Sequence, residues 1–334
     1  MTSKNKITFG ADLIPLDPSF IGPFAKYIED HGFSHIWVAD VNFNSDVYVA
    51  LTTIALHTKR VYLGPGVTNP LTRHPAYTGI AIASLNALSR GRAKLALGTG
   101  DYHIMRELKL LPEKPIRALK EGLSIIRRVL NNEEFEHTGE FYHISHFKMT
   151  IKNPSSVPIY IAGKGPTILR TAGEVGDGAY LDAIPPEAFP TALKFIEKGL
   201  VKSGRSLKDF YLIDVIGLVV NKDREKALQD AKKDAIFAVT SAPKYIREAL
   251  GIDIETIEHI KSKFPDTEAA INAVPLDVAE KLAIAGTPED CIEKISKLEK
   301  LGVNQISMIL YAEEKSKERV KSVYENVISY FEEQ

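Results

Sequence analysis

Short apolar segments alternate with helical segments along most of this 334-residue chain, and this alternation restricts the possible folds more than any other feature. Apolar and β-branched runs predict eight strands, at residues 7–12, 35–39, 61–63, 93–97, 158–162, 178–181, 212–220 and 305–310. Strands that alternate with helices form parallel sheets. We therefore predict an α/β fold, a (β/α)8 TIM barrel in one domain over residues 1–334.

Two of the connecting segments hold more than a single helix. Residues 135–142 carry a Gly turn between alternating aromatic residues, which predicts a hairpin after the fourth strand. Residues 223–285 are mostly helical, with no reliable strand pattern, and follow the seventh strand. The barrel is therefore expected to carry insertions after strands 4 and 7, and to end in a charged amphipathic helix.

Composition excludes several classes of protein. The formal net charge is -1, whereas a nucleic-acid surface needs a concentrated basic face. The single Cys rules out an intramolecular disulfide framework and a cysteine zinc cluster. The first six residues do not resemble a signal peptide, and no apolar run is long enough to span a bilayer. We expect a soluble cytoplasmic protein without nucleic-acid or membrane partners.

The segment 63–70 (LGPGVTNP) links the third predicted strand to a rigid polar loop. Gly permits unusual backbone conformations and lets a ligand approach the main chain closely. Parallel α/β folds place their ligands at strand ends of this kind. An ordinary strand-to-helix turn is the alternative interpretation.

Polar residues follow the ends of several predicted strands. In a barrel they converge on one mouth, where active sites are built. These residues are Asp12, Asp40, Asn69, Asp101 and Lys164. Taken singly, each Asp is also explained as a helix cap, but their number favours a functional site.

Two Gly-rich turns are candidate anion sites. Gly98-Thr99-Gly100 and Gly163-Lys164-Gly165 would present backbone amides at helix N-termini. Neither turn matches a Walker A loop or a GxGxxG motif, so neither is specific alone.

The nine His show no spacing typical of metal ligands, and we predict no metal site. His31, His35 and His57 are interpreted as surface or helix-end residues.

Several strings together resemble the bacterial-luciferase-like superfamily. They are VAD at 38–40, LGPGVTNP at 63–70, GRA at 91–93, GTGD at 98–101, PIYIA at 158–162, TAGEVGDG at 171–178, AGTPED at 285–290 and LGV at 301–303. Within the superfamily, the chain is most similar to the archaeal methylenetetrahydromethanopterin reductases, which depend on the deazaflavin coenzyme F420.

This resemblance implies a binding site for coenzyme F420 at the barrel mouth. The positions that match cofactor-binding positions are Asp40, Gly66, Val67, Asn69, Thr99, Gly100, Asp101, Gly163, Lys164 and Gly165. The Gly66-Val67 bond matches a non-prolyl cis peptide behind the ring, and residues 163–165 match the turn that holds the phosphate of the tail. The resemblance further implies a pterin-type small-molecule substrate and a homodimer or higher homo-oligomer.

Two positions depart from the patterns of relatives. Asp12 occupies a position where the reductases usually carry Glu, the proposed proton donor, so the carboxyl is kept on a shorter side chain. Relatives that oxidise alcohols or sugar phosphates carry a His directly after the Asp that matches Asp40, whereas this chain has Val41. We therefore expect hydride transfer between deazaflavin C5 and a pterin-bound one-carbon unit, with Asp12 as general acid.

Three alternatives stay open at this point. The chain is an F420-dependent enzyme for another substrate such as an alcohol, an FMN-dependent monooxygenase of the same superfamily, or a flavin-binding member without catalytic activity.

Overall fold

We analysed a computed structural model that describes residues 6–15, 17–41 and 45–333. Eight parallel strands form the central sheet, in the order β3-β2-β1-β12-β9-β8-β7-β4. Their bounds are β1 Thr8–Ile14, β2 His35–Val38, β3 Tyr62–Pro65, β4 Leu95–Leu97, β7 Ile159–Ala162, β8 Gly178–Asp182, β9 Tyr211–Val215 and β12 Gln305–Tyr311. Parallel bridges from Leu63 to Ala93 and from Thr68 to Leu97 join the two edges, so the sheet closes into the predicted barrel.

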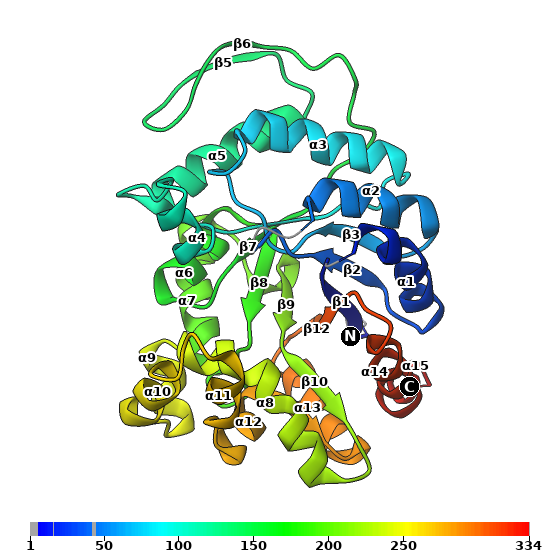
Figure 1. Cartoon of the computed structure of the whole chain (residues 1–334). Helices are drawn as coiled ribbons and strands as arrows, with labels where there is room; N and C mark the ends of the chain where they lie inside the picture. Colours follow the sequence, from blue (N-terminus) through cyan, green and yellow to red (C-terminus); the bar gives the residue numbers. More distant parts are fainter. Residues whose placement is uncertain (1–5, 16, 42–44, 334) are drawn as a thin grey trace.

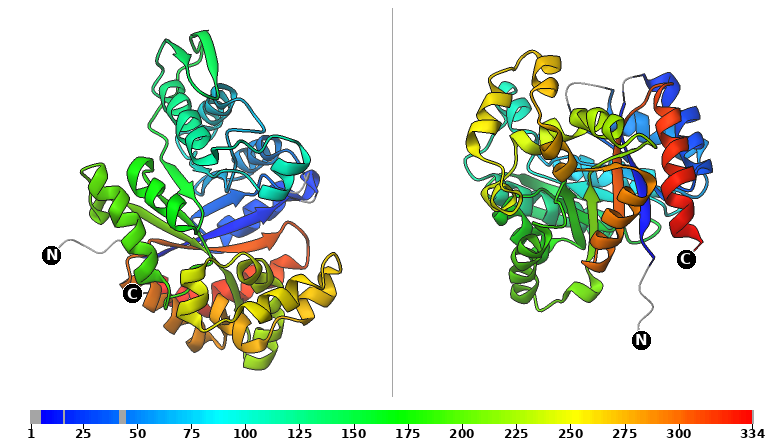
Figure 2. Two further views of the ribbon diagram at one scale, coloured as in Figure 1. Left: turned by 90° about the vertical axis from the view of Figure 1, so that its left-hand side faces the viewer. Right: turned by 90° about the horizontal axis from the view of Figure 1, so that it is seen from below.

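Helices surround the barrel on its outer side (Figures 1 and 2). The helices that follow the first three strands are α1 Pro18–Asp30, α2 Val47–His57 and α3 Pro75–Leu88; those after β7, β8 and β12 are α6 Pro166–Val175, α7 Phe189–Lys202 and α14 Ser316–Val323. A 3-10 turn at Leu207–Asp209 precedes β9. The strands are apolar on both faces because one face packs against these helices and the other fills the barrel interior.

Helix starts follow the local signals in the sequence. Asp17 caps α1 by accepting a hydrogen bond from the Ser19 amide at 2.8 Å, and Pro18 is the first helical residue. Helices α3 and α5 (Pro115–Leu130) also begin with Pro as the first helical residue. These signals act within a few residues of each helix start.

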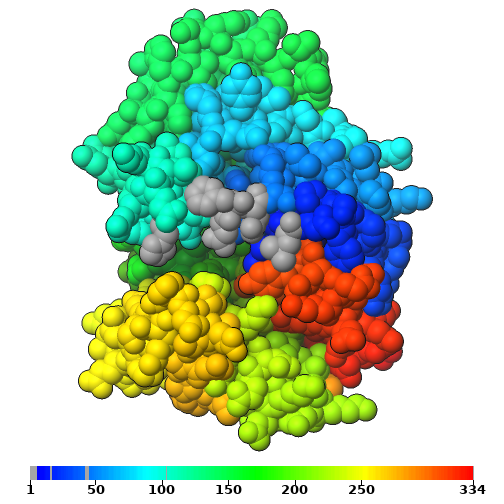
Figure 3. All heavy atoms as spheres, in the orientation of Figure 1, coloured from blue at the N-terminus to red at the C-terminus, as the bar shows by residue number. Residues whose placement is uncertain are grey.

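The insertion after β4 contains α4 (Tyr102–Glu107), α5 and a two-stranded hairpin of β5 (Phe135–Thr138) and β6 (His143–Phe147). The hairpin is confirmed, although its second strand begins after the predicted segment. It extends beyond α3 and α5, on the opposite side of the molecule from the insertion that follows β9 (Figures 1 and 3).

The insertion after β9 differs from the prediction. The segment 212–220 was predicted as one strand, but it divides at Ile216 into β9, which belongs to the barrel, and β10 (Gly217–Val220). Strand β10 pairs with β11 (Ala283–Gly286), a strand within the segment predicted to be helical. The helices of this insertion are α8 Arg224–Thr240, α9 Lys244–Leu250, α10 Ile254–Lys261, α11 Thr267–Asn272, α12 Leu276–Leu282 and α13 Pro288–Lys300. Apolar periodicity identifies a strand but not the sheet that it joins, so the division was not predictable locally.

The chain ends beside its own first helix. Helix α14 continues through a π turn at Tyr324–Ile328 into α15 (Ser329–Glu332), and α14 packs against α1 (Figure 2). None of the helices in the described residues is long and apolar enough to cross a membrane. The segment 1–5, considered above for a signal peptide, lies outside the described residues.

Buried polar side chains hold the start of β3 in place. The Glu29 carboxylate accepts hydrogen bonds from the amides of Lys59, Arg60 and Val61 at 2.9, 2.6 and 3.0 Å. The guanidinium of Arg92 donates to the carbonyls of neighbouring residues, including Val61 at 2.7 Å. Both side chains therefore fix the strand that leads into the loop 64–70.

His35 corrects one expectation. It is buried in β2 rather than exposed, and its ring stacks between Trp37 and Tyr62 with centroid distances of 6.1 and 5.0 Å. Burial and the charge of Lys94 lower the pKa of His35 to about 3, so the ring is neutral and part of the core.

Candidate active site

The carboxyl ends of the barrel strands surround a cavity of about 370 Å³, at the end of the barrel where this fold places its active sites. The predicted site residues in its lining are Asp12, Gly66, Val67, Thr99, Gly100, Asp101 and Gly163. The other lining residues are Ile14, Ala39, Val41, Gly98, Ala162, Tyr180, Asp182, Val215 and Ile309. The lining is mostly small and apolar, with a few carboxylates and hydroxyls.

A second hollow of about 260 Å³ adjoins this cavity and shares Val41 and Asp101 with it. Asp40 and Asn69 lie in this second lining. Nine of the predicted positions thus face one continuous region of the barrel mouth, seven in the first cavity and two more in the second.

Asp12 lies within β1 rather than after it, because the strand continues to Ile14. Its side chain points into the barrel, where Oδ1 accepts a hydrogen bond from Tyr180 at 2.5 Å and Oδ2 accepts one from Ser307 at 2.8 Å. Burial raises the pKa of Asp12 to about 7; the two hydrogen bonds act in the opposite direction, and the charge of Asp182 adds to the rise. A carboxylic acid with this pKa holds a proton in a large fraction of molecules at neutral pH, as a general acid requires.

Asp40 and Asn69 shape the second hollow. The Thr68 hydroxyl donates to Oδ2 of Asp40 at 2.7 Å, and burial raises the pKa of Asp40 against the effect of this bond. Oδ1 of Asn69 accepts from the amides of Leu71 and Thr72 at 2.8 and 2.9 Å. The side-chain carbonyl of Asn69 thus fixes the turn at the end of the loop.

The end of β3 and the loop that follows it have no room for a side chain at Gly64 or Gly66. A Cβ on Gly66 would lie 2.4 Å from the Tyr180 hydroxyl and 2.7 Å from Cβ of Trp37, and one on Gly64 would lie 2.0 Å from the Lys94 carbonyl oxygen. The Gly66-Val67 peptide is cis, as the resemblance implied.

Backbone geometry also explains the Gly-rich turn after β4. Gly100 has φ +85°, a conformation that favours glycine. The Asp101 carboxylate accepts a hydrogen bond from the Ile104 amide at 3.0 Å, at the start of α4. Thr99 and Gly100 are thereby held in the cavity wall.

Lys164 and Gly165 lie outside both cavity linings. Only 9% of the Lys164 side chain is exposed, and its Nζ lies 2.8 Å from Oδ2 of Asp182 in an ion pair. The Tyr245 hydroxyl on α9 donates to the Lys164 carbonyl at 2.9 Å. Gly165 is the N-cap residue of α6. The positive charge next to the mouth is therefore already matched by one carboxylate.

The sequence did not indicate the partners of Asp12. Tyr180 and Ser307 lie inside strands and do not follow a turn. The one signal in the sequence was a hydroxyl group within a segment that is otherwise mostly apolar. The sequence also did not indicate Asp214, a second fully buried carboxyl whose pKa burial raises to about 7. Oδ1 of Asp214 accepts a hydrogen bond from the Ile184 amide at 3.1 Å, next to the turn that follows β8.

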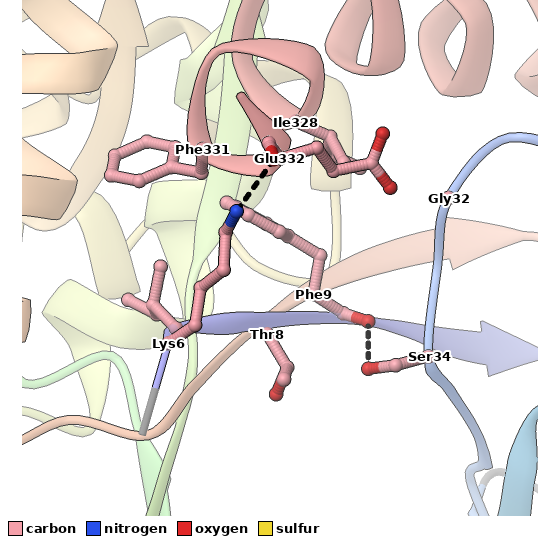
Figure 4. A pocket seen from close by; sticks show the side chains of 9 residues that line it. Lys6, Thr8, Phe9, Gly32, Ser34, Ile328, Phe331 and Glu332 are labelled. Atoms are coloured by element: carbon pink, nitrogen blue, oxygen red, sulfur yellow. Dashed lines mark hydrogen bonds between the residues drawn. The ribbon is translucent and has the colours of Figure 1, made fainter. Parts of the chain in front are cut away.

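Another hollow of about 260 Å³ lies at the opposite end of the barrel, between the start of β1 and α15 (Figure 4). Lys6 donates to the Glu332 carbonyl at 2.7 Å, and Ser34 donates to the Phe9 carbonyl at 3.0 Å (Figure 4). Because these polar groups bind backbone and the strands run away from this end, we do not assign catalysis to it.

Across the described ranges, no group of three or more His, Cys, Asp or Glu side chains is arranged to hold a metal ion.

Comparisons with known proteins agree with the barrel fold. A 5,10-methylenetetrahydromethanopterin reductase from Archaeoglobus fulgidus is 34% identical to this chain, and the alignment covers 89% of this chain and 92% of the relative. The enzyme of the same name from Methanolobus tindarius is 36% identical over 90% of this chain and 93% of its own. The solved structure of the coenzyme F420-dependent tetrahydromethanopterin reductase from Methanopyrus kandleri superposes with a TM-score of 0.88 at 31% identity, covering 98% of this chain and 99% of that one.

The model of the luciferase-like monooxygenases matches residues 9–305. This match spans the barrel from β1 to the start of β12, including both insertions. The chain therefore belongs to the luciferase-like monooxygenase family.

Proposed function

We propose that this chain is a coenzyme F420-dependent oxidoreductase that reduces 5,10-methylenetetrahydromethanopterin to the methyl form. The observation that carries the proposal is the buried carboxyl of Asp12, with its pKa raised to about 7, in the lining of the cavity at the barrel mouth. Relatives that are 34% and 36% identical to this chain carry the name of this reductase, and they align with 89% and 90% of the chain.

The cavity has properties that fit a deazaflavin ring. Its volume of about 370 Å³ falls within the usual range for small-molecule sites. Gly66, Gly98, Gly100 and Gly163 lie in the lining, so backbone atoms form part of the wall around this space. Around this space we assign the ring to Gly66, Val67, Thr99, Gly100 and Asp101, with Asp40 and Asn69 beside it in the adjoining hollow.

The cofactor tail is assigned to the turn at residues 163–165. Gly163 lies in the cavity lining, and Gly165 begins α6, whose N-terminus favours an anion. Lys164 would add its charge here once its ion pair with Asp182 is exchanged for a phosphate. Coenzyme F420, when bound, supplies the hydride.

The residues of the chain bind, orient and donate a proton. Asp12, held at a fixed position by Tyr180 and Ser307, is the source of the proton that a nitrogen of the methylene bridge takes up, so that the bridge opens to an iminium ready to accept a hydride. The apolar lining, including Ile14, Val215 and Ile309, excludes water and keeps Asp12 protonated at neutral pH.

Val41 argues against alcohol oxidation as the reaction. It lies in the lining of both cavities, next to Asp40, and its isopropyl group cannot remove a hydroxyl proton. Val41→His should therefore raise alcohol oxidation slightly and leave pterin reduction unimproved, because the acid for that reaction lies on β1.

The test is the absorbance of reduced coenzyme F420 mixed with the protein and each candidate substrate. Reoxidation in the visible band with methylenetetrahydromethanopterin, and not with a simple alcohol, is expected. Parallel titrations with FMN and F420 separate the monooxygenase alternative. Rapid oxidation of an alcohol, or preferential binding of FMN, would contradict the proposal.

A further inference from the structure

The Tyr180 hydroxyl lies between Asp12 and the loop that lines the cavity. It donates to Oδ1 of Asp12 at 2.5 Å, and a Cβ on Gly66 would lie 2.4 Å from the same oxygen. The Trp37 ring packs edge-on against Tyr180, with centroids 5.2 Å apart, and restricts the phenol to this position. The hydroxyl is thus fixed in contact with both the acid and the wall of the ring site.

Both oxygens of Asp12 are already engaged by hydroxyl groups. Oδ2 accepts from Ser307, whose side chain is completely buried and does not line the cavity. Oδ1 accepts from Tyr180, which does line it. A proton on Asp12 therefore has a hydroxyl oxygen next to it on the cavity side, and that oxygen has lone pairs to accept it.

We propose that Tyr180 is a catalytic residue that relays the proton from Asp12 to the substrate, an inference that rests on the proposed function. When Asp12 is protonated on Oδ1, this O–H donates to the Tyr180 oxygen and the phenolic O–H turns toward the cavity, the reverse of the bond that Tyr180 makes to the carboxylate. In one step the O–H bond of Asp12 breaks and its proton binds the Tyr180 oxygen. The original phenolic proton moves to the bridge nitrogen. Asp12 ends as a carboxylate, Tyr180 ends neutral, and no further reactant is needed.

Asp182 is the one other charged group among the described residues that acts on the acid–hydroxyl pair. The titratable groups that act on Asp12 in the described chain are Tyr180 and Asp182, both on β8. The residues paired with Asp12 on the neighbouring strands are Trp37 and Ile309, which do not titrate. Burial and the neighbouring Asp12 raise the pKa of Tyr180 well above its ordinary value, so the phenol keeps its proton between turnovers.

The test compares Tyr180→Phe with Ser307→Ala. Each variant removes one hydrogen bond to the carboxylate form of Asp12, and each should raise the pKa of Asp12 from about 7 to about 8. The ¹³C signal of the Asp12 carboxyl, followed against pH in the protein without cofactor, measures this directly. A titration unchanged in both variants would overturn the hydrogen-bonded arrangement on which the relay depends.

Turnover then separates the two hydroxyls. Turnover is measured with reduced F420 and methylenetetrahydromethanopterin over a range of pH. Tyr180→Phe should lower the plateau of the kcat–pH profile by about 10²-fold, although Asp12 stays protonated to higher pH in this variant. Ser307→Ala should also move the alkaline limb of the kcat–pH profile to higher pH, but with a much smaller loss of kcat. Tyr160→Phe removes another buried phenol that packs on Trp37 without contacting Asp12, and controls for folding.

A Tyr180→Phe plateau within about threefold of wild type would overturn the relay and leave the proposed function intact. A wild-type protein that does not reoxidise F420 with the pterin would overturn both. A proton inventory of the wild type is independent of any variant: kcat in H2O/D2O mixtures should curve, because two protons move together, and a straight line would contradict the relay.

Discussion

Lys164 Nζ lies 2.8 Å from Oδ2 of Asp182, joining the turn after β7 to the last residue of β8. The Lys164 side chain is 9% exposed and that of Asp182 is 55% exposed. An anionic cofactor tail at this turn therefore competes with Asp182 for the ammonium group.

If Lys164 binds the tail, Asp182→Asn should tighten F420 binding at low salt and Lys164→Met should weaken it by about tenfold, because a charge-assisted hydrogen bond is lost. Both effects should shrink at high salt, where charges are screened. Fluorescence titration of F420 at two salt concentrations measures them, and the double variant Lys164→Met/Asp182→Asn is the matched control. An unchanged dissociation constant for Lys164→Met at low salt would refute the assignment.

Asp12→Asn tests the general acid. Asn is nearly isosteric with Asp, so cofactor affinity should change little while kcat falls by about 10²–10⁴-fold, the usual contribution of general acid catalysis. Steady-state kinetics and F420 titration of the same preparation give both quantities. Wild-type turnover in Asp12→Asn would leave the barrel and its cofactor site but remove the mechanism.

The raised pKa of Asp12 also predicts a cost in stability. Because the folded-state pKa is about 7 and the ordinary value is 3.8, the folded state binds more protons than the unfolded state between these pH values. The free energy of unfolding therefore falls as pH rises from about 4 to about 7 and stays low above it. Asp12→Asn should raise Tm relative to wild type at pH 8, with a stabilisation on the order of a few kcal/mol that disappears near pH 4.

Calorimetry across this pH range measures the difference. Asp230→Asn, at an exposed position on α8, is the control and should leave the pH dependence of Tm unchanged. If Tm depended on pH in Asp12→Asn in the same way as in the wild type, Asp12 would not have the raised pKa.

Glu29 should contribute strongly to stability. Burial acts to raise the pKa of Glu29, but the amides of Arg60, Val61 and Lys59 outweigh it and lower the pKa. Glu29→Ala leaves the buried amide of Val61 and the partly buried amides of Lys59 and Arg60 without this acceptor, and should lower the free energy of unfolding by about 3 kcal/mol. The stabilisation from the carboxylate is present above the unfolded pKa and is lost as pH falls through the lowered folded pKa.

Urea denaturation at pH 7 measures this loss. Asp30→Asn, next to Glu29 but in an exposed ion pair with Lys26, should lower the free energy of unfolding much less than Glu29→Ala. Equal losses in the two variants would show that the buried amides find other partners.

The sequence by itself determined the barrel, the approximate bounds of most strands and nine of the residues that line the mouth. Hydrophobic period, helix caps such as Asp17 and the Gly-rich loop at 63–70 act over a few residues, so they can be recognised without knowing what packs against them. The resemblance located the Gly66-Val67 cis bond for the same reason, since it rests on a contiguous string.

Only the tertiary structure decided which side chains meet. Asp12, Tyr180 and Ser307 come from β1, β8 and β12, and closure of the barrel brings them together over separations of 168 and 295 residues. Long-range strand order also divided 212–220 between two sheets and paired Lys164 with Asp182. Apolar pattern specifies that a segment is buried, whereas the partner of each buried polar atom depends on strands that are distant in sequence, and this is why the acid could be predicted but its hydroxyl partners could not.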